Sequence, residues 1–390
     1  MPVMSRHPNR LRSHPVRPLL VFFLGLAIAA TAHAGTAPLS AAVRVAKWQL
    51  AHRDVSIRSS RYPREAARAN AWQQAAFWSG MTALADRLPG EKWITRSILA
   101  MGRSEHWQVG PRPYHADDQA IGQVYVWAAG HGAGEAALAP FRAHLDWILA
   151  HPPVVGLAFH QDKSGVECQR RWCWADALFM APPGWVALSR ATGDPRYRCR
   201  ALAEFRRTAG FLYDPAEHLF YRDSRFFERR DGKGRKVFWS RGNGWVFASL
   251  ARIIPMLPAN DPDRRWMVKL FRQMAERLVE IQKPDGYWAP SLLAPEGSPP
   301  ETSGSSFFTY GLAWGVRAGW LDRARYEPAA KRGWAALLRA VQPDGRLGYV
   351  QMIGDRPDAV AASDTQFYGV GGFLFAATAV ADMEASDPKR

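Results

Sequence analysis

The sequence lacks the motifs that mark the commonest metal and nucleotide sites. It contains no HExxH segment, no His/Cys quartet and no calcium-type series of carboxylates, so no metal is implied. It also contains no GxSxG elbow, no P-loop and no GxGxxG after a strand. Gly130, Gly132 and Gly134 fall in GHGAGE, which we interpret as an interhelix loop. The motifs therefore predict no cofactor, and any chemistry has to come from the protein's own side chains.

Cysteine is scarce, with only Cys168, Cys173 and Cys199 in 390 residues. An odd number allows at most one intrachain disulfide and leaves one thiol over. Cys168 and Cys173 are close enough in sequence to pair, and burial as small apolar side chains is the alternative.

Long apolar runs are confined to the first 34 residues. This segment opens with four Arg, continues with the apolar run Leu19 to Ala30 and ends in Ala32-His33-Ala34, the pattern of a secretory signal cleaved after Ala34. The run is too short for a transmembrane helix, and no later segment offers about eighteen uninterrupted apolar residues. We therefore expect a signal peptide at 1–34 and a mature chain, 35–390, that is secreted or periplasmic and not membrane-bound.

Acidic residues are outnumbered, which gives the chain a net charge of +16. The leader holds four Arg and no acid, so the remaining chain has 47 Lys+Arg against 35 Asp+Glu and a net charge of +12. A basic exported protein suits an acidic partner, either a polyanionic polysaccharide or a nucleic acid. No zinc-finger spacing, RNP-like segment or long Lys/Arg run supports nucleic acid. The Arg residues are scattered, as on a solvated face.

Strand-like alternation is nearly absent, whereas helical periodicity runs through most of the chain. Between Asp261 and Gln282, six apolar residues recur at spacings of three and four, as on one face of an amphipathic helix. Pro and Gly separate successive stretches of this kind. The chain reads as all-α, with further helices expected at Val43–Ala51, Ala66–Leu88, Ala120–Trp127, Phe141–Ala150, Ala177–Thr192, Arg198–Leu212, Trp245–Leu257, Phe308–Gly319, Tyr326–Val341 and Gly369–Met383.

A weak internal repeat indicates how the helices are grouped. The segment Gln282-Lys-Pro-Asp-Gly286 returns as Gln342-Pro-Asp-Gly345, sixty residues further on between the two Gln residues. In both copies a helix ends, a Pro-Asp-Gly turn follows, and an extended piece comes next. Sixty residues hold one helical hairpin, and about six hairpins fit the mature length. We therefore predict a single domain built as a ring of paired helices.

The segment Trp172–Trp185, WCWADALFMAPPGW, places one carboxylate, Asp176, among three Trp, a Phe and a Met. Desolvation by such neighbours penalises the charged form, so it raises the pKa of an Asp and lets it hold a proton near neutral pH. A general acid requires this property. The alternative is that Asp176 caps the following helix, since Asp is a preferred N-cap and caps far outnumber catalytic acids. The two roles are compatible.

Two adjacent acids stand in His115-Ala-Asp117-Asp118-Gln119, just before an apolar helix. We expect Asp117 or Asp118 to cap that helix. Adjacent acids can also hold a water or a sugar hydroxyl. Both are therefore candidate catalytic residues, and His115 is a candidate substrate contact.

Two further segments are rich in groups suited to a ligand. In Phe238–Trp245, FWSRGNGW, two glycines allow the backbone to approach a ligand, Arg241 offers a planar fork for a carboxylate, and Trp239 and Trp245 offer flat faces for a sugar ring. In Glu301–Ser306, the polar groups Thr302 and Ser303 are candidate contacts, and a helix cap is the alternative.

Taken in order, the motifs ADDxxIGQ, WxDALFMAPP, FWxRGNGW, QxPDGxW and ExSGSS resemble glycoside hydrolase family 105, the unsaturated rhamnogalacturonyl hydrolases related to unsaturated glucuronyl hydrolases. The resemblance covers essentially the whole mature chain. It implies an (α/α)6 barrel of six helical hairpins with a deep pocket at one end. It also implies the substrate, an anionic oligosaccharide from a polysaccharide lyase that carries a 4,5-unsaturated uronic acid at its non-reducing end.

The reaction implied by the resemblance is hydration of the vinyl ether in that sugar. A protonated acid gives its proton to C4, water adds at C5, and the unstable hemiketal opens and releases the aglycone, outside the usual two-carboxylate scheme. Asp176 matches the family's general acid, and Asp117 or Asp118 its second carboxylate. Trp174, Trp239, Arg241 and Trp245 match pocket positions, with Arg241 suited to the uronate carboxylate.

One position departs from the family pattern. Relatives that act on rhamnogalacturonan carry a His after the aromatic pair that is Phe220-Tyr221 here, and this chain has Arg222. We expect Arg222 to contact substrate and to favour a more anionic or differently linked partner sugar. Rhamnogalacturonan fragments are the first expectation. The alternatives are the same reaction on ulvan or glycosaminoglycan fragments, and a non-catalytic glycan-binding barrel.

Overall fold

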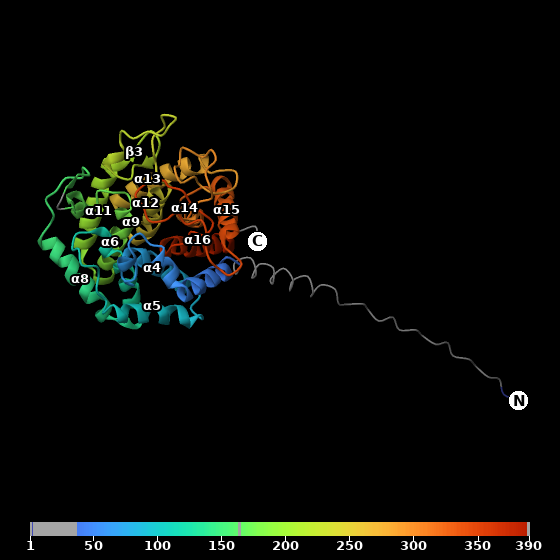
Figure 1. Ribbon diagram of the computed structural model, residues 1–390. Helices are drawn as coiled ribbons and strands as arrows, with labels where there is room; N and C mark the ends of the chain where they lie inside the picture. Colours follow the sequence, from blue (N-terminus) through green and yellow to red (C-terminus); the bar gives the residue numbers. More distant parts are fainter. Residues whose placement is uncertain (1, 3–36, 163–164, 388–390) are drawn as a thin grey trace.

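The computed structural model describes residues 37–162 and 165–387, together with Pro2. The predicted signal peptide therefore lies outside the described residues apart from Pro2. Within the described part, the chain forms two layers of helices, one inside the other (Figure 1). None of the helices in these ranges is long and apolar enough to cross a bilayer.

The inner layer is a closed ring of six helices. Each contacts the next one along the chain, and the last contacts the first. The ring consists of α4 (Trp72–Arg87), α7 (Gly122–Ala128), α10 (Pro182–Thr192), α12 (Ser240–Ile253), α14 (Thr302–Arg317) and α16 (Phe367–Ala385).

The outer layer pairs with the inner one in chain order, because five outer helices each pack on the inner helix that precedes them. This arrangement is the predicted (α/α)6 barrel, a single domain around one hydrophobic core. The outer helices are α5 (Lys92–Ser104), α8 (Glu135–Ala150), α11 (Pro195–Leu212), α13 (Pro262–Glu280) and α15 (Arg323–Ala340), and a helical stretch at 37–51 that leads to α2 (Arg53–Arg58) stands outside the ring as well.

Short elements connect the hairpins. Two of them, α3 and α9, replace parts of longer predicted helices. The connections contain α3 (Pro63–Ala66), α6 (Ala116–Gln119), η1 (Ala129–Ala133), β1 (Gln161–Asp162), β2 (Gly165–Val166), η2 (Glu167–Arg171), α9 (Ala177–Met180), β3 (Tyr213–Asp214), β4 (Leu219–Phe220), η3 (Ser224–Phe226) and η4 (Ile254–Met256).

The two layers differ in sequence as their positions require. α16 buries nearly every residue, and its Phe, Val, Gly and Ala side chains suit a helix that is surrounded by protein. α13 instead buries one face and leaves its Arg and Glu residues toward solvent. Three outer helices, α11, α13 and α15, begin with an Asp whose carboxylate accepts a hydrogen bond from a backbone N–H of the first turn, a contact worth about 1 kcal/mol each.

The Pro-Asp-Gly repeat marks successive hairpins, as predicted. One copy follows α13 and the other follows α15. Gly286 and Gly345 have φ values of 90° and 100°, in the left-handed region that favours glycine. At Gly286 an added Cβ would lie 2.4 Å from the carbonyl oxygen of Arg332, so this turn also packs closely on α15.

Several predicted helix boundaries were wrong, and three of them bear on the site. The stretch 66–88 is divided into α3 and α4, and the stretch 177–192 is divided where Pro182 begins α10. α12 begins at Ser240, so the glycines of FWSRGNGW lie inside a helix and not in a loop. A Cβ on Gly244 would lie 3.2 Å from Cβ of Phe307, so this glycine lets α12 approach α14 and does not admit a ligand.

The cysteines resolve the alternatives left open by the sequence. Cys168 and Cys173 form a disulfide and are also buried, and Cys199 is an exposed free thiol. The disulfide joins η2 to the segment that leads into Asp176, three residues further on.

Candidate active site

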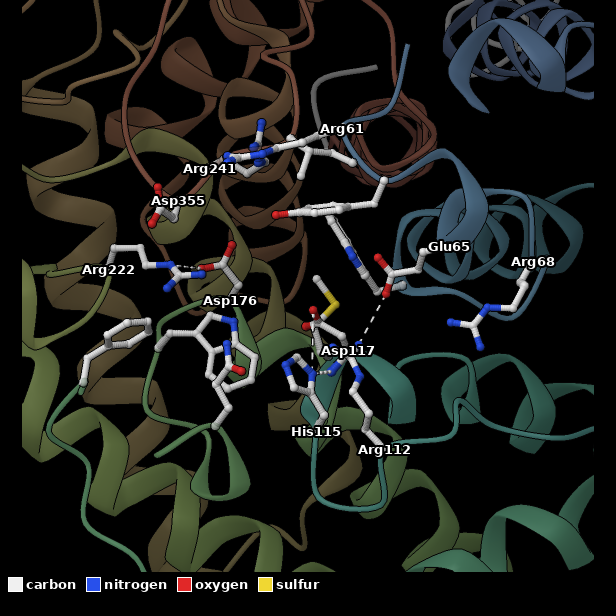
Figure 2. Close-up of a pocket in the computed structure, with 18 of the residues that line it drawn as sticks. Arg61, Glu65, Arg68, Arg112, His115, Asp117, Asp176, Arg222, Arg241 and Asp355 are labelled. Atoms are coloured by element: carbon white, nitrogen blue, oxygen red, sulfur yellow. Dashed lines mark hydrogen bonds and ion pairs between the residues drawn. The ribbon is translucent and has the colours of Figure 1, made fainter. Parts of the chain in front are cut away.

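A cavity of about 970 Å³ lies at the end of the barrel where inner helices begin (Figure 2). Helix N-termini carry partial positive charge, which suits an anionic ligand. The cavity is lined by Arg61, Tyr62, Pro63, Arg64, Glu65, Arg68, Trp72, Arg112, His115, Asp117, Phe159, Gln169, Trp174, Asp176, Met180, Arg222, Arg225, Arg241, Ile353, Gly354 and Asp355.

Asp176 faces this cavity from the segment before α9. Its side chain makes no cap hydrogen bond, so the capping interpretation was wrong although the residue stands at the N-cap position. The residue is 8% exposed, and its Oδ2 has no hydrogen-bond partner among the described residues. Burial raises the pKa of Asp176, and the nearby charges of Arg222 and Arg241 only oppose the shift. Asp176 therefore meets the requirement for a proton donor.

The adjacent acids Asp117 and Asp118 point to different places. Asp118 accepts hydrogen bonds from the backbone N–H, Nε and Nη2 of Arg112 at 2.7, 3.0 and 2.7 Å, and it does not line the cavity. Burial alone would raise the pKa of Asp118, but the bonds and charge of Arg112 hold it below the usual value. The prediction that Asp118 acts in the site is therefore not supported, because its carboxylate is committed to Arg112.

Asp117 lines the cavity with a side chain that is 19% exposed. Burial is the main reason why the pKa of Asp117 rises to about 8. Asp176 and Glu65 add to the rise, and Arg112 opposes it. Figure 2 shows Asp117 and Asp176 facing the same space from opposite sides. The site thus holds two buried acids with raised pKa values, and the charge of Asp176 adds to the rise at Asp117.

His115, and neither acid, caps α6. Its Nδ1 accepts a hydrogen bond from the backbone N–H of Asp117 at 3.3 Å. Asp117 and Asp118 lie inside α6, and α7, the apolar helix that one of them was predicted to cap, begins after Ile121 without a side-chain cap, so that prediction was wrong. Burial, together with the charge of Arg112, lowers the pKa of His115 to about 4. The ring is therefore neutral at pH 7. It lines the cavity, as predicted, with its centroid 5.0 Å from that of Trp174, a second predicted contact.

Arg222 connects Asp176 to a chain of charged groups. Its Nε lies 3.4 Å from Oδ2 of Asp176, and its Nη1 lies 2.7 Å from Oδ2 of Asp223. Asp223 also accepts from Arg225, which in turn pairs with Asp355 at 2.8 Å. The backbone N–H of Ala175 donates to the carbonyl oxygen of Arg222 at 2.8 Å, which fixes the two segments side by side. Arg222, a predicted substrate contact, therefore lines the cavity with its cation close to Asp176.

Arg241 presents a cation that no carboxylate neutralises in the described structure. Its guanidinium donates to the carbonyl oxygens of Gln351 and Met352 at 2.6 and 2.9 Å. It also lies 4.4 Å from the ring centre of Trp239 and 4.7 Å from that of Tyr368. Dipoles and aromatic faces hold the group in place while its charge remains available to an anionic ligand.

Four predicted contacts do not line the cavity. Trp239 donates a hydrogen bond from Nε1 to Oε1 of Gln351, and its ring packs against the guanidinium of Arg241. It therefore helps to hold that guanidinium in place. Trp245 packs in the core against Phe179 and Phe307. Thr302 and Ser303 are fully buried in the first turn of α14.

The polar segment before α14 is a helix cap. The carboxylate of Glu301 accepts hydrogen bonds from the backbone N–H groups of Ser303 and Gly304, both at 2.8 Å. This confirms the capping alternative and explains why Thr302 and Ser303 are not at the cavity. Ser303 contributes indirectly, since Nη1 of Arg241 lies 3.4 Å from its Oγ.

Sequence reasoning missed much of the cavity wall. The segment around α3 supplies Arg61, Tyr62, Arg64, Glu65 and Arg68. Three Arg within eight residues beside an exposed Tyr-Pro pair is a usable signal, but scattered Arg were interpreted as a solvated face. His218, close to the position where relatives have His, stacks on Tyr213 and does not line the cavity.

Two carboxyls with raised pKa values lie among arginines at the mouth of the (α/α)6 barrel, an arrangement that suits a glycosidase acting on anionic sugars. The model of Glycosyl Hydrolase Family 88 matches residues 41–384, and the chain belongs to that family.

Individual relatives narrow the class. The chain is 41% identical over 345 residues to the unsaturated 3S-rhamnoglycuronyl hydrolase of Alteromonas sp. (strain LOR). The aligned region covers 85% of this chain and 83% of the relative. It is 35% identical over 351 residues to the protein of the same name from Formosa agariphila, with 88% and 90% covered. A solved structure described as glycosyl hydrolase family 88 from Bacteroides vulgatus has a TM-score of 0.77 at 27% identity, covering 90% of this chain and 99% of that one. The chain is therefore a glycosidase that removes an unsaturated uronic acid from oligosaccharides, and a non-catalytic barrel is not favoured.

Proposed function

We propose that Asp176 is the general acid of this reaction and that Asp117 is a second catalytic carboxyl that stays protonated. The observation that carries the assignment is the position of Arg222, whose Nε lies 3.4 Å from Oδ2 of Asp176. A proton donor has to become a carboxylate during the reaction. Asp176 has a cation beside it for that state, whereas Arg112, the cation nearest Asp117, is taken up by Asp118 and Glu65.

The proposed steps conserve atoms and charge. The carboxyl of Asp176 gives its proton to C4 of the unsaturated sugar, and the positive charge that develops at C5 is quenched by a water molecule. The carboxylate of Asp176 takes a proton from that water, so it returns to its starting state. The C5 hemiketal then opens and releases the aglycone. Asp117, with a pKa of about 8, donates a hydrogen bond to a sugar or water oxygen and does not change its charge.

Two arginines are proposed to hold the uronate carboxylate. Arg241 presents a fixed guanidinium at the cavity, and Arg222 lies next to the acid. An anion bound here also neutralises the cations that oppose the raised pKa of Asp176. Substrate binding therefore favours the protonated acid at the moment when it is needed.

The aglycone is proposed to be a rhamnose that carries a sulfate. The support is the 3S-rhamnoglycuronyl activity in the names of the two relatives, together with seven arginines in one cavity wall. This proposal keeps the rhamnose of the expected rhamnogalacturonan-type substrate and adds an anionic group to it.

Export is proposed from two observations. Residues 1–34 have the composition of a secretory signal. Cys168 and Cys173 are joined by a disulfide, a bond that persists in oxidising compartments. Amino-terminal sequencing of protein from a periplasmic extract tests the proposal, with a mature chain expected to begin at Gly35.

Isotope labelling tests the chemistry directly. We expect reaction in D2O to place one deuterium at C4 of the released uronic acid, and reaction in 18O-water to label C5. Cleavage of the glycosidic bond by attack at C1 would instead place the 18O at C1, and this result would refute the hydration mechanism; C4 takes up deuterium by either route, because the freed sugar opens to an enol that becomes the keto acid. The rate is measured from the loss of the ultraviolet absorbance of the C4=C5 bond. We expect Asp176→Asn to reduce this rate about 100- to 10,000-fold.

A further inference from the structure

The cavity has an arginine-rich side that the proposed chemistry does not use. Arg61, Tyr62, Arg64 and Arg68 all line the cavity and come from α3 and its flanking residues; we call this set the α3 wall. Figure 2 shows Arg68 on the side of the cavity opposite Arg222, with Arg61 drawn beside Arg241 at the top of the view.

The arginines of the α3 wall differ from the others in the cavity. Arg112, Arg222 and Arg225 each form an ion pair with a carboxylate. Arg241 donates to two carbonyl oxygens. In contrast, Arg61, Arg64 and Arg68 make no ion pair or side-chain hydrogen bond within the described ranges, and Glu65, the one acid in their midst, is bonded to Arg112 and Gln73. Three cations therefore face the cavity without an anion.

An aromatic surface accompanies these charges. Tyr62 is 49% exposed, although large apolar and aromatic side chains are mostly buried in this protein. The guanidinium of Arg61 lies 5.8 Å from the centre of its ring. A flat ring beside a cation suits a sugar ring that carries an anionic substituent, since the ring face packs on the sugar while the charge meets the anion.

The cavity has room for a ligand longer than one sugar. Its volume of about 970 Å³ is near the upper end of the roughly 300–1,000 Å³ of sites that enclose a whole drug-sized molecule. The unsaturated ring is proposed to occupy the space next to Asp176, Arg222 and Arg241. The next sugar then lies toward the α3 wall.

We propose that the α3 wall is a subsite for a sulfate ester on the aglycone, with Arg61, Arg64 and Arg68 around the sulfate and Tyr62 under the sugar ring. The proposal rests on the proposed function, because it assumes that the unsaturated ring lies at Asp176. A sulfate ester keeps one negative charge at every pH at which the protein is folded, and guanidinium groups bind such oxyanions with well-directed hydrogen bonds.

The opposite side of the cavity is less suited to the sulfate. There the charges of Arg222 and Arg225 are shared with Asp223 and Asp355. A second anion near these carboxylates would be repelled. The distribution of unpaired cations therefore separates the two negative groups of the substrate, with the carboxylate at Arg241 and the sulfate at α3.

A matched pair of substrates tests the subsite. The probes are an unsaturated uronyl-rhamnose disaccharide with a 3-sulfate on rhamnose and the same compound after desulfation. We expect the combined variant Arg61→Gln, Arg64→Gln and Arg68→Gln to lose about 10- to 100-fold in kcat/KM on the sulfated probe, mainly through KM, because each exposed charge pair contributes only a few-fold. The loss on the desulfated probe should be under about threefold. Tyr62→Ala should weaken the binding of both probes.

The control is Arg58→Gln. Arg58 stands three residues before the α3 wall, is strongly exposed, pairs with Asp54 at 2.6 Å and does not line the cavity. Its removal changes the net charge by the same amount as one α3-wall substitution, and we expect no change on either probe. The wild-type preference for the sulfated probe should narrow as ionic strength rises above about 0.1 M, because exposed charges are screened.

The outcomes separate the two proposals. If the wild type consumes neither probe, the proposed function fails. If the wild type consumes both but the combined variant is unchanged, or loses equally on both, the function stands and the sulfate subsite is refuted. A sulfate-specific loss in Arg225→Gln with none in the combined variant would place the sulfate on the opposite side and also refute it.

Discussion

The site contains two carboxyl pairs that are built alike and differ at one contact. In one pair, Asp118 takes Arg112 and leaves Asp117 protonated. In the other, Asp223 pairs with Arg222, and burial raises the pKa of Asp176. The pKa values of Asp118 and Asp223 are lowered by their arginines despite burial. Each pair thus has one member that binds an arginine and one member with a raised pKa that faces the cavity.

The two pairs differ in the second group that the arginine contacts. Nε of Arg222 lies 3.4 Å from Oδ2 of Asp176, whereas the side-chain hydrogen bonds of Arg112 go to Asp118 and Glu65. In the proposed mechanism, Asp176 therefore exchanges its proton and Asp117 stays a hydrogen-bond donor. Two neighbouring acids of the same type acquire separate roles from the direction of one guanidinium.

The variants Asp176→Asn and Asp117→Asn test this comparison with the largest expected effect. Asn cannot transfer a proton but still donates a hydrogen bond. We expect a loss in kcat of about 100- to 10,000-fold for Asp176→Asn and of about tenfold or less for Asp117→Asn. Steady-state rates from the absorbance of the double bond measure both. Equal losses would show that the two acids are not distinguished in this way.

Replacing Arg222 tests the contact itself. Arg222→Gln removes a cation that opposes the raised pKa of Asp176, so the pKa rises further. Because the acid form is required, kcat/KM falls as pH rises through this pKa, and in the variant that alkaline limb should move to higher pH. We expect kcat/KM at neutral pH to fall about tenfold through weaker binding of the uronate. Arg225→Gln, one ion pair further from Asp176, should shift the alkaline limb of kcat/KM less. An unshifted limb in Arg222→Gln would contradict the assignment of Asp176 as the general acid.

Stability should change in opposite directions at the adjacent acids. Asp118→Asn removes the partner of Arg112 and should destabilise the fold by about 1–3 kcal/mol at neutral pH. The stability that Asp118 contributes is present above its unfolded pKa and is lost as pH falls through its lowered folded pKa. Chemical denaturation at pH 7 and at acidic pH measures the difference from wild type, and an unchanged variant would mean that the Arg112 bonds add nothing.

Asp117→Asn should give the smallest effect, a stabilisation on the order of 1–2 kcal/mol at neutral pH. A carboxyl with a folded pKa of about 8 and a model value of 3.8 costs stability as pH rises between these values, because the unfolded chain ionises first. The advantage of the variant should therefore vanish near pH 4 and grow toward pH 8. A difference from wild type that does not depend on pH would exclude the raised pKa.

The fold was predictable because it depends on patterns that a single chain carries. Periodicity gave the helices, and the Pro-Asp-Gly repeat gave the hairpin spacing. The aromatic surroundings of Asp176 in the sequence indicated its burial, and the structure confirms it. The choice between Asp117 and Asp118 was not accessible, since identical neighbouring residues differ only in which one Arg112 reaches. The glycines near Arg241 were misassigned because close helix packing and ligand approach use the same residue type.

The α3 wall was missed for a different reason. An arginine that meets solvent and an arginine that meets a cavity look alike in sequence, and only the curvature of the closed ring separates them. Arg58 and Arg64 are six residues apart, and one pairs with Asp54 while the other faces the site.

The way Arg241 is held has a consequence for biogenesis. Its guanidinium is fixed by carbonyl oxygens that lie 110 and 111 residues later in the chain, and by the ring of Tyr368 in the last helix. A nascent polypeptide that has emerged only as far as α15 lacks these groups, so the cation has no fixed place. The part of the pocket around Arg241 therefore forms only after the segment that follows α15 and the helix α16 have packed against the ring.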